Sequence, residues 1–208
     1  MRIHLNIVRR HMQPDHRANL NVAAHAVGES LALAWAHFHL LRGIDNGRLK
    51  HPQVVHKVNL FYDRLWRAAF DAFFVKVGTV LDNKRGNHSL LSFLTLARRY
   101  ADPEVRKVLP AIEADLAKDD APLAKLKRWR HEVVAHKPAV HDAIDFHAQN
   151  RMTLTEIEHA LEQLDEYLNQ ISLNVLGFHS EHRSAFEGVV QQAESLFAAA
   201  ALGLPQHE

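Results

Sequence analysis

Residues 52–82 read PQVVHKVNLFYDRLWRAAFDAFFVKVGTVLD, and this stretch decides the fold. Pro52 suits the first turn of a helix. Apolar residues then recur every three or four positions, which predicts a single helix; they are Val58, Phe61, Leu65, Ala69, Phe73, Val77 and Val80. Further apolar residues lie off this stripe, at Trp66, Phe70, Phe74 and Val75. We therefore expect a central helix with apolar contacts on most of its sides.

The rest of the chain carries similar helix signals. The expected helices cover residues 16–43, 52–82, 89–100, 103–116, 122–137, 153–176 and 181–202. Ser89 is a candidate N-cap, and Thr153 with Glu156 forms a capping box. Gly43 is expected to end the first helix, and Pro110 to kink or break the fourth. No stretch alternates with period two, so we predict an all-α bundle of about six to seven helices.

Composition excludes several classes of protein. The chain has 208 residues and no cysteine, so it has no disulfide, no thiolate nucleophile and no Cys-ligated zinc. Lys and Arg total 25 against 24 for Asp and Glu, so overall charge selects no polyanionic partner. The N-terminus lacks a signal-peptide core, and the longest apolar run, 196–204, is shorter than the roughly 18 residues of a membrane span. We expect a soluble, cytoplasmic protein with no membrane association.

The 17 histidines raise the question of a metal site. His131 and His136 stand in HEVVAH, which differs from the zinc-protease motif H-E-x-x-H by one residue of spacing. Five residues turn a regular helix so that the two rings point about 140° apart, too far to share one ion. The pairs His37 with His39 and His179 with His182 lie near the ends of expected helices, and we expect these histidines at the surface. We therefore predict no metal ligands and no cofactor.

Positive charge is concentrated on one expected helix. Residues 123–138 contain five cations and one acid, a local net charge of +4 (5 − 1); the cations are Lys125, Lys127, Arg128, Arg130 and Lys137. Such a helix can face a polyanion, or its cations can simply complement the helix dipole. Within it, Trp129 can stack on a base, although core packing is the favoured interpretation. Asp82 is expected to be a cap or turn residue.

The stretch from Arg130 to His136, followed by Lys137, resembles the R-x(4–6)-H signature of HEPN domains. Residues 70–94 and 152–176 resemble the apolar helix and the closing helix of the AbiU-like abortive-infection branch of that superfamily. The resemblance spans residues 15–180. It divides the chain into an N-terminal arm over 1–14, a HEPN-like helical domain over 15–180, and a C-terminal helix over 181–208 that packs on this domain.

This resemblance implies a metal-independent endoribonuclease of a toxin or abortive-infection type. It implies a homodimer whose motif helices form one composite site, and it allows an antitoxin partner. Arg130 would clamp the RNA phosphate and His136 would act as acid and base, while Lys127, His131 and Lys137 would contact flanking RNA phosphates. A histidine titrates near neutral pH and an arginine keeps its charge, so both residue types suit these roles.

His131 marks a departure from the pattern, because many members of the family carry Asn or Asp directly after the motif arginine. This departure favours an alternative, a non-catalytic helical module that binds RNA or a protein partner. A His-ligated metalloenzyme is a third interpretation.

Overall fold

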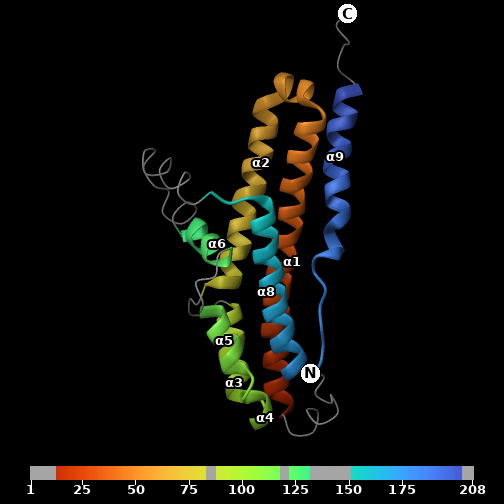
Figure 1. The fold of residues 1–208 in the computed structure, drawn as a ribbon. Helices are drawn as coiled ribbons and strands as arrows, with labels where there is room; N and C mark the ends of the chain where they lie inside the picture. Colours follow the sequence, from red (N-terminus) through yellow and green to blue (C-terminus); the bar gives the residue numbers. More distant parts are fainter. Residues whose placement is uncertain (1–12, 83–87, 118–121, 132–150, 203–208) are drawn as a thin grey trace, which may run out of the picture.

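The computed structural model describes residues 13–82, 88–117, 122–131 and 151–202 (Figure 1). Regular structure in these ranges is entirely helical, so the all-α prediction is confirmed. The helices are α1 (Pro14–Lys50), α2 (Pro52–Leu81), α3 (Leu90–Tyr100), α4 (Pro103–Arg106), α5 (Leu109–Ala117), α6 (Leu123–Trp129), α8 (Leu154–Val175) and α9 (Glu187–Leu202), with a 3-10 turn, η2, at Ser184–Phe186. None of the helices described is long and apolar enough to cross a bilayer.

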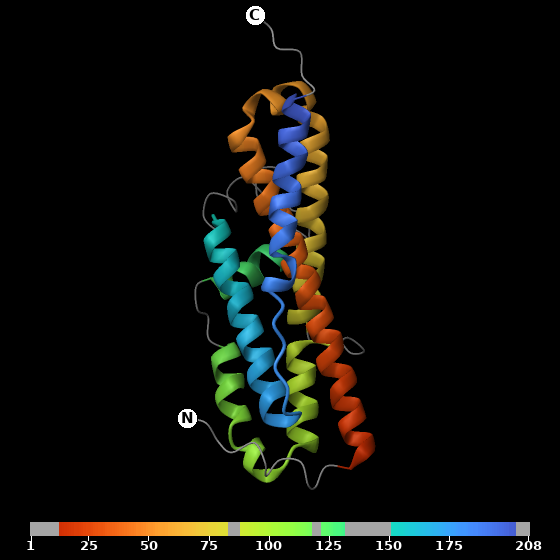
Figure 2. The same cartoon turned by 90° about the vertical axis from the view of Figure 1, so that its right-hand side faces the viewer.

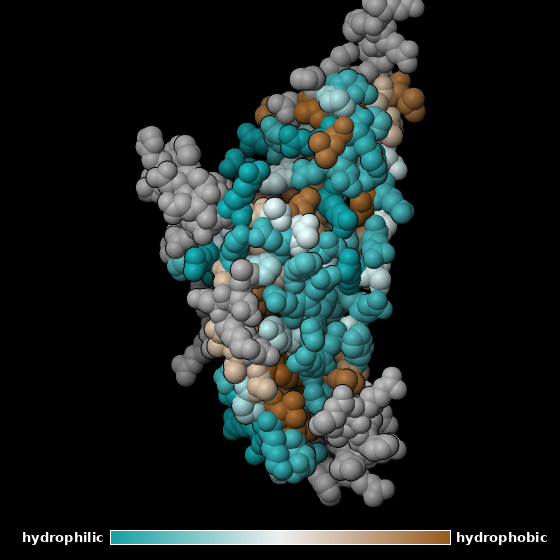
Figure 3. Space-filling model, in the orientation of Figure 1, coloured by the Kyte–Doolittle hydropathy of each residue, from teal (hydrophilic) through white to brown (hydrophobic). Residues whose placement is uncertain are grey.

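Helices α1 and α2 form a long antiparallel pair; α1 runs from the lower to the upper end of the described bundle, while α2 descends from the upper end and stops above α3 (Figures 1 and 2). Helix α8 packs on the lower half of α1, and α9 packs on its upper half. The short helices α3, α5 and α6 complete the lower half, where the main hydrophobic core lies. A smaller core of Ile44, Val54, Tyr62 and Phe197 joins α1, α2 and α9. The face drawn in Figure 3 is mostly hydrophilic, with small separate apolar patches.

Helix α2 has a buried face and an exposed face, which corrects the expectation of apolar contacts on most sides. Phe73, Val77 and Val80 are fully buried, because this face lies against α1. Phe61 and Val75 are instead 62% and 57% exposed. Both residues lie on the side of the helix away from α1, where Phe61 meets the ring of its neighbour Tyr62 edge-on at 5.3 Å between centroids and still exposes most of its own ring.

Helix α1 does not end at Gly43, as the sequence had suggested, but continues to Lys50. A β-carbon at Gly43 would lie 2.6 Å from the β-carbon of Ala193 on α9. Gly47 meets the ring of Phe197 in the same way. Both glycines therefore permit a close approach of α9 to α1, and this packing outweighs the cost of glycine in a helix.

Most of the other helix boundaries follow their sequence signals. Ser89 and Thr153 both form capping boxes, at the starts of α3 and α8. The expected break near Pro110 is confirmed, because α4 ends before this proline and α5 begins with it in its first turn. Gly177, with φ of 78°, follows the end of α8. The last helix begins at Glu187 rather than at 181, and the second half of the helix expected over 122–137 lies outside the described residues.

Candidate functional site

The motif arginine forms an ion pair between two helices. Arg130 follows α6 directly, where the chain continues in a wider, π-type turn. Its guanidinium donates to the carboxylate of Asp82, the residue that follows α2. The two side chains are 22% and 21% exposed, so the pair lies at the edge of the core. Asp82 is thus more than the cap or turn residue expected from the sequence, because it also orients the arginine.

Gly78 provides the space that Arg130 occupies. A β-carbon at Gly78 would lie 2.9 Å from Nε of Arg130, which is closer than packed atoms approach. The backbone of α2 therefore forms the floor under the guanidinium, and Asp82 lies one helical turn further along. A guanidinium has five N–H donors in a fixed plane. An arginine held in this way can pair with Asp82 and still present donors to a phosphate.

Trp129 anchors the helix that presents Arg130. Its side chain is only 9% exposed. The indole stacks on Phe74 at 6.2 Å between ring centroids and meets Phe70 edge-on at 5.9 Å. The structure therefore confirms the core-packing interpretation of Trp129 and leaves no exposed ring for stacking on a base.

The two lysines of α6 tie this helix to its neighbours. Nζ of Lys127 donates to the carbonyl of Leu116 at 3.0 Å, close to the end of α5. Nζ of Lys125 donates to Glu156 at 2.6 Å, at the start of α8. Chiefly through this hydrogen bond, Lys125 lowers the pKa of the Glu156 carboxyl to about 2. Part of the local positive charge is therefore neutralised within the fold.

The remaining residues expected at the site are only partly described. Arg128 and His131 are both exposed, on the last turn of α6 and just after it. His136 and Lys137 lie outside the described residues. The structure thus brings Arg130 together with Asp82, which the sequence reasoning had not assigned to the site, while the ammonium of Lys127 binds the carbonyl of Leu116.

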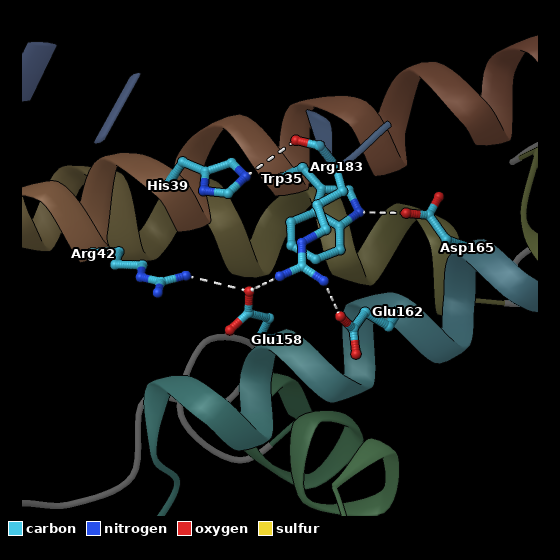
Figure 4. A network of polar contacts seen from close by, with 7 residues as sticks. All are labelled: Trp35, His39, Arg42, Glu158, Glu162, Asp165 and Arg183. Carbon is cyan, nitrogen blue, oxygen red and sulfur yellow. Dashed lines mark hydrogen bonds and ion pairs between the residues drawn. The ribbon is translucent and has the colours of Figure 1, made fainter. Parts of the chain in front are cut away.

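A second polar cluster, which no sequence motif predicts, lies where α1, α8 and the segment after α8 meet (Figure 4). One carboxylate oxygen of Asp165 accepts from Nε1 of Trp35 at 2.6 Å. The other accepts from Nδ1 of His182 at 2.6 Å. The expectation that His182 lies at the surface is wrong, because its side chain is only 11% exposed. Its ring packs against Gly28 of α1.

The neighbouring residues extend this cluster along α8. Arg183 pairs with Glu158 at 2.7 Å and with Glu162, and its carbonyl accepts from Nε2 of His39 at 3.3 Å. His39 is buried in the core, which corrects its expected surface position, and burial lowers its pKa. Trp35 and His39 find their partners 130 and 144 positions away, which local spacing cannot reveal. These contacts fasten the segment that leads to α9 (Figure 2), and we assign them a structural role.

Comparison with known proteins gives one match. A family model described as AbiU2, in the HEPN group, matches residues 17–190. The match includes Gly78, Asp82 and the R-x5-H motif, and it ends near the start of α9. The search of curated proteins and the search of solved structures found no match.

Proposed function

Because the chain belongs to the AbiU2 family of HEPN proteins, we propose that it is a metal-independent endoribonuclease of a toxin or abortive-infection type. The substrate is RNA, whose 2′-hydroxyl is the attacking group. As this oxygen bonds to phosphorus, it loses its proton to a base, and the bond to the 5′-oxygen breaks as an acid protonates the leaving group. The products carry a 2′,3′-cyclic phosphate and a 5′-hydroxyl.

In this proposal Arg130 is the phosphate clamp and His136 is the acid and base. Arginine binds phosphate through two parallel N–H donors and stays charged throughout the reaction. Histidine can both take and give a proton near neutral pH. Lys127, His131 and Lys137 contact flanking phosphates, and the reaction needs no metal and no cofactor.

A second copy of the chain completes the proposed site. Six residues separate Arg130 from His136, which is about 120° of rotation on a straight helix, so the two side chains bracket a groove. A two-fold axis at the motif helices brings two arginines and two histidines around one phosphate. We place this homodimer in the cytoplasm, where an antitoxin partner can restrain it.

The observation that best supports the proposal is the fixed position of Arg130. An arginine that served only as a surface charge would need neither Gly78 nor Asp82. Here the guanidinium has space on one side and a carboxylate that orients it. A preorganised cation of this kind stabilises the charge that develops on a phosphate in the transition state.

The alternative is a helical module that binds RNA or a protein partner without cleavage. His131 favours it, because the family commonly has Asn or Asp at this position. The same Arg130 would then bind phosphate without chemistry. Such a module shows a steep salt dependence of RNA affinity and forms no product.

The test is incubation of purified, untagged protein with labelled RNA in EDTA, followed by analysis of the product ends. We expect 2′,3′-cyclic phosphate ends, and loss of cleavage in His136→Ala. The matched control is His159→Ala, since His159 is an exposed histidine of α8. Salt-dependent RNA binding without product would favour the binding module, and activity abolished by EDTA would favour a metalloenzyme. Full activity of folded His136→Ala contradicts the catalytic assignment.

A further inference from the structure

Helix α2 has an exposed stripe of apolar, charged and small residues on the face away from α1. The stripe consists of Phe61, Arg64, Ala68, Asp71 and Val75, at steps of three and four residues, and all five are exposed. Steps of three and four place residues on one side of a helix. We call this set the α2 stripe.

Nothing in the described part of the chain covers this stripe. Helix α2 packs on α1, touches α9 and α3, and contacts Trp129 of α6 through Phe70 and Phe74, which lie off the stripe. Among the described residues, neither Arg64 nor Asp71 has an ion-pair partner. Two large apolar side chains, Phe61 and Val75, flank this pair of opposite charges at 62% and 57% exposure.

The stripe is complementary to itself when it is reversed. Counted from Ala68, Phe61 and Val75 lie at −7 and +7, and Arg64 and Asp71 at −4 and +3. A two-fold axis at Ala68 therefore brings each Arg64 level with the partner's Asp71, to within about 1.5 Å along the helix. Each Phe61 then meets the partner's Val75. The small Ala68 lies on the axis, where two backbones must approach most closely.

We infer that the α2 stripe is an interface between two copies of this chain, packed antiparallel about an axis at Ala68. An isologous contact requires one surface patch to fit itself, and the order of apolar, positive, small, negative and apolar residues meets this requirement. Complementary charges fix the register, and the aromatic residue of each copy supplies apolar contact area.

This interface does not rest on the proposed ribonuclease activity and is separate from the seam at the motif helices. Gly78, against which the Arg130 side chain lies, is ten residues beyond Ala68, or about 15 Å along α2. The α2 contact therefore joins two copies without merging their motif arginines. With the α2 contact alone the assembly is a dimer, and with both contacts about perpendicular axes it is a tetramer. Loss of the α2 contact halves the mass of each of these two assemblies.

Charge reversal provides a direct test, with assembly mass measured by native mass spectrometry and by sedimentation. Arg64→Asp and Asp71→Arg should each halve the mass and raise the dissociation constant at least about tenfold, because like charges then face each other. An equimolar mixture of the two variants should recover the full mass, since one copy has two acids and the other two bases. The double variant Arg64→Asp/Asp71→Arg should also recover it.

Matched controls are Arg67→Asp and Asp63→Arg, which make the same charge changes on exposed positions of α2 outside the stripe. Both should keep the full mass. The inference is overturned when the wild-type protein has the mass of one chain at micromolar concentration, when Arg64→Asp retains the full mass, or when the mixture of complementary variants fails to reassociate. RNA cleavage is measured in a separate assay. Loss of the α2 interface can therefore be told apart from loss of the proposed ribonuclease activity.

Discussion

The guanidinium of Arg130 donates to the carboxylate of Asp82, a residue 48 positions earlier in the chain. The contact joins the end of α2 to the end of α6 and passes over the backbone of Gly78. It fixes the orientation of the guanidinium of Arg130, the first residue of the R-x5-H motif. The consequences for stability and activity can be separated by substitution at each of the three positions.

Gly78→Ala should move Arg130 without unfolding the protein. The new β-carbon would lie 2.9 Å from Nε of Arg130, a flexible side chain that can shift. Alanine also favours a helix over glycine by about 1 kcal/mol, so the free energy of unfolding should change by less than about 1 kcal/mol. RNA cleavage should fall at least about tenfold, because small displacements of a clamping group are costly. Thr79→Ala is the neighbouring control, and equal activity of the two variants argues against a role for the Arg130 position.

A double-mutant cycle should detect the Arg130–Asp82 pair in the free energy of unfolding. Urea denaturation of Arg130→Ala, Asp82→Ala and the double variant should give a coupling of about 1 kcal/mol, because both side chains are only about a fifth exposed. Strictly additive effects of the two substitutions would show that the contact contributes nothing to stability.

Gly43→Ala should destabilise the fold through α9. The added β-carbon would lie 2.6 Å from the Ala193 β-carbon and 2.8 Å from the carbonyl oxygen of Val190, and a backbone atom cannot move aside. We expect a loss of about 1–3 kcal/mol, as for other overpacked cores. Gly188→Ala is the matched control, with nothing within 4 Å of its added β-carbon. It should be neutral or stabilising by up to about 1 kcal/mol, and equal effects at the two glycines would contradict the close packing of α9.

Protonation of Glu156 should lower the stability of the protein in acid. Its pKa in the folded state is lowered from 4.5 to about 2, chiefly by the hydrogen bond from Lys125. Its contribution is therefore complete above about pH 4.5 and is lost as the pH falls toward 2, because the unfolded chain takes up the proton first. Glu156→Gln keeps a capping-box residue and should reduce the drop in Tm between pH 7 and pH 3. An unchanged drop would assign the acid sensitivity to other carboxyl groups.

Local signals in the sequence predicted most of the fold. Capping residues and prolines act within one helical turn, so Ser89, Thr153 and Pro110 were interpreted correctly. Gly43 was not, since its role depends on a helix 150 residues later. Periodicity predicts Phe61 on the buried stripe, because periodicity alone cannot distinguish an apolar residue that packs within this chain from one that stays exposed. This same ambiguity is the origin of the α2 stripe.

The candidate site was predicted in part, for a related reason. The motif identified Arg130 because its residues are close in sequence. Asp82 and Gly78 lie on and just after another helix, and the pairing of His182 with Asp165 depends on how the irregular segment after α8 folds back onto that helix. Such contacts follow from tertiary packing, which a single sequence does not specify for each residue.

The most direct test of the central claim is the single-turnover rate of RNA cleavage in EDTA by Arg130→Ala and Arg128→Ala, measured beside wild type. The two arginines lie two residues apart at the end of α6, but only Arg130 is held by Asp82. The account predicts a loss of at least about a hundredfold for Arg130→Ala, as for other removed groups that stabilise transition-state charge, and less than about threefold for Arg128→Ala. Equal rates for the two variants, or no cleavage by the wild-type protein, would contradict it.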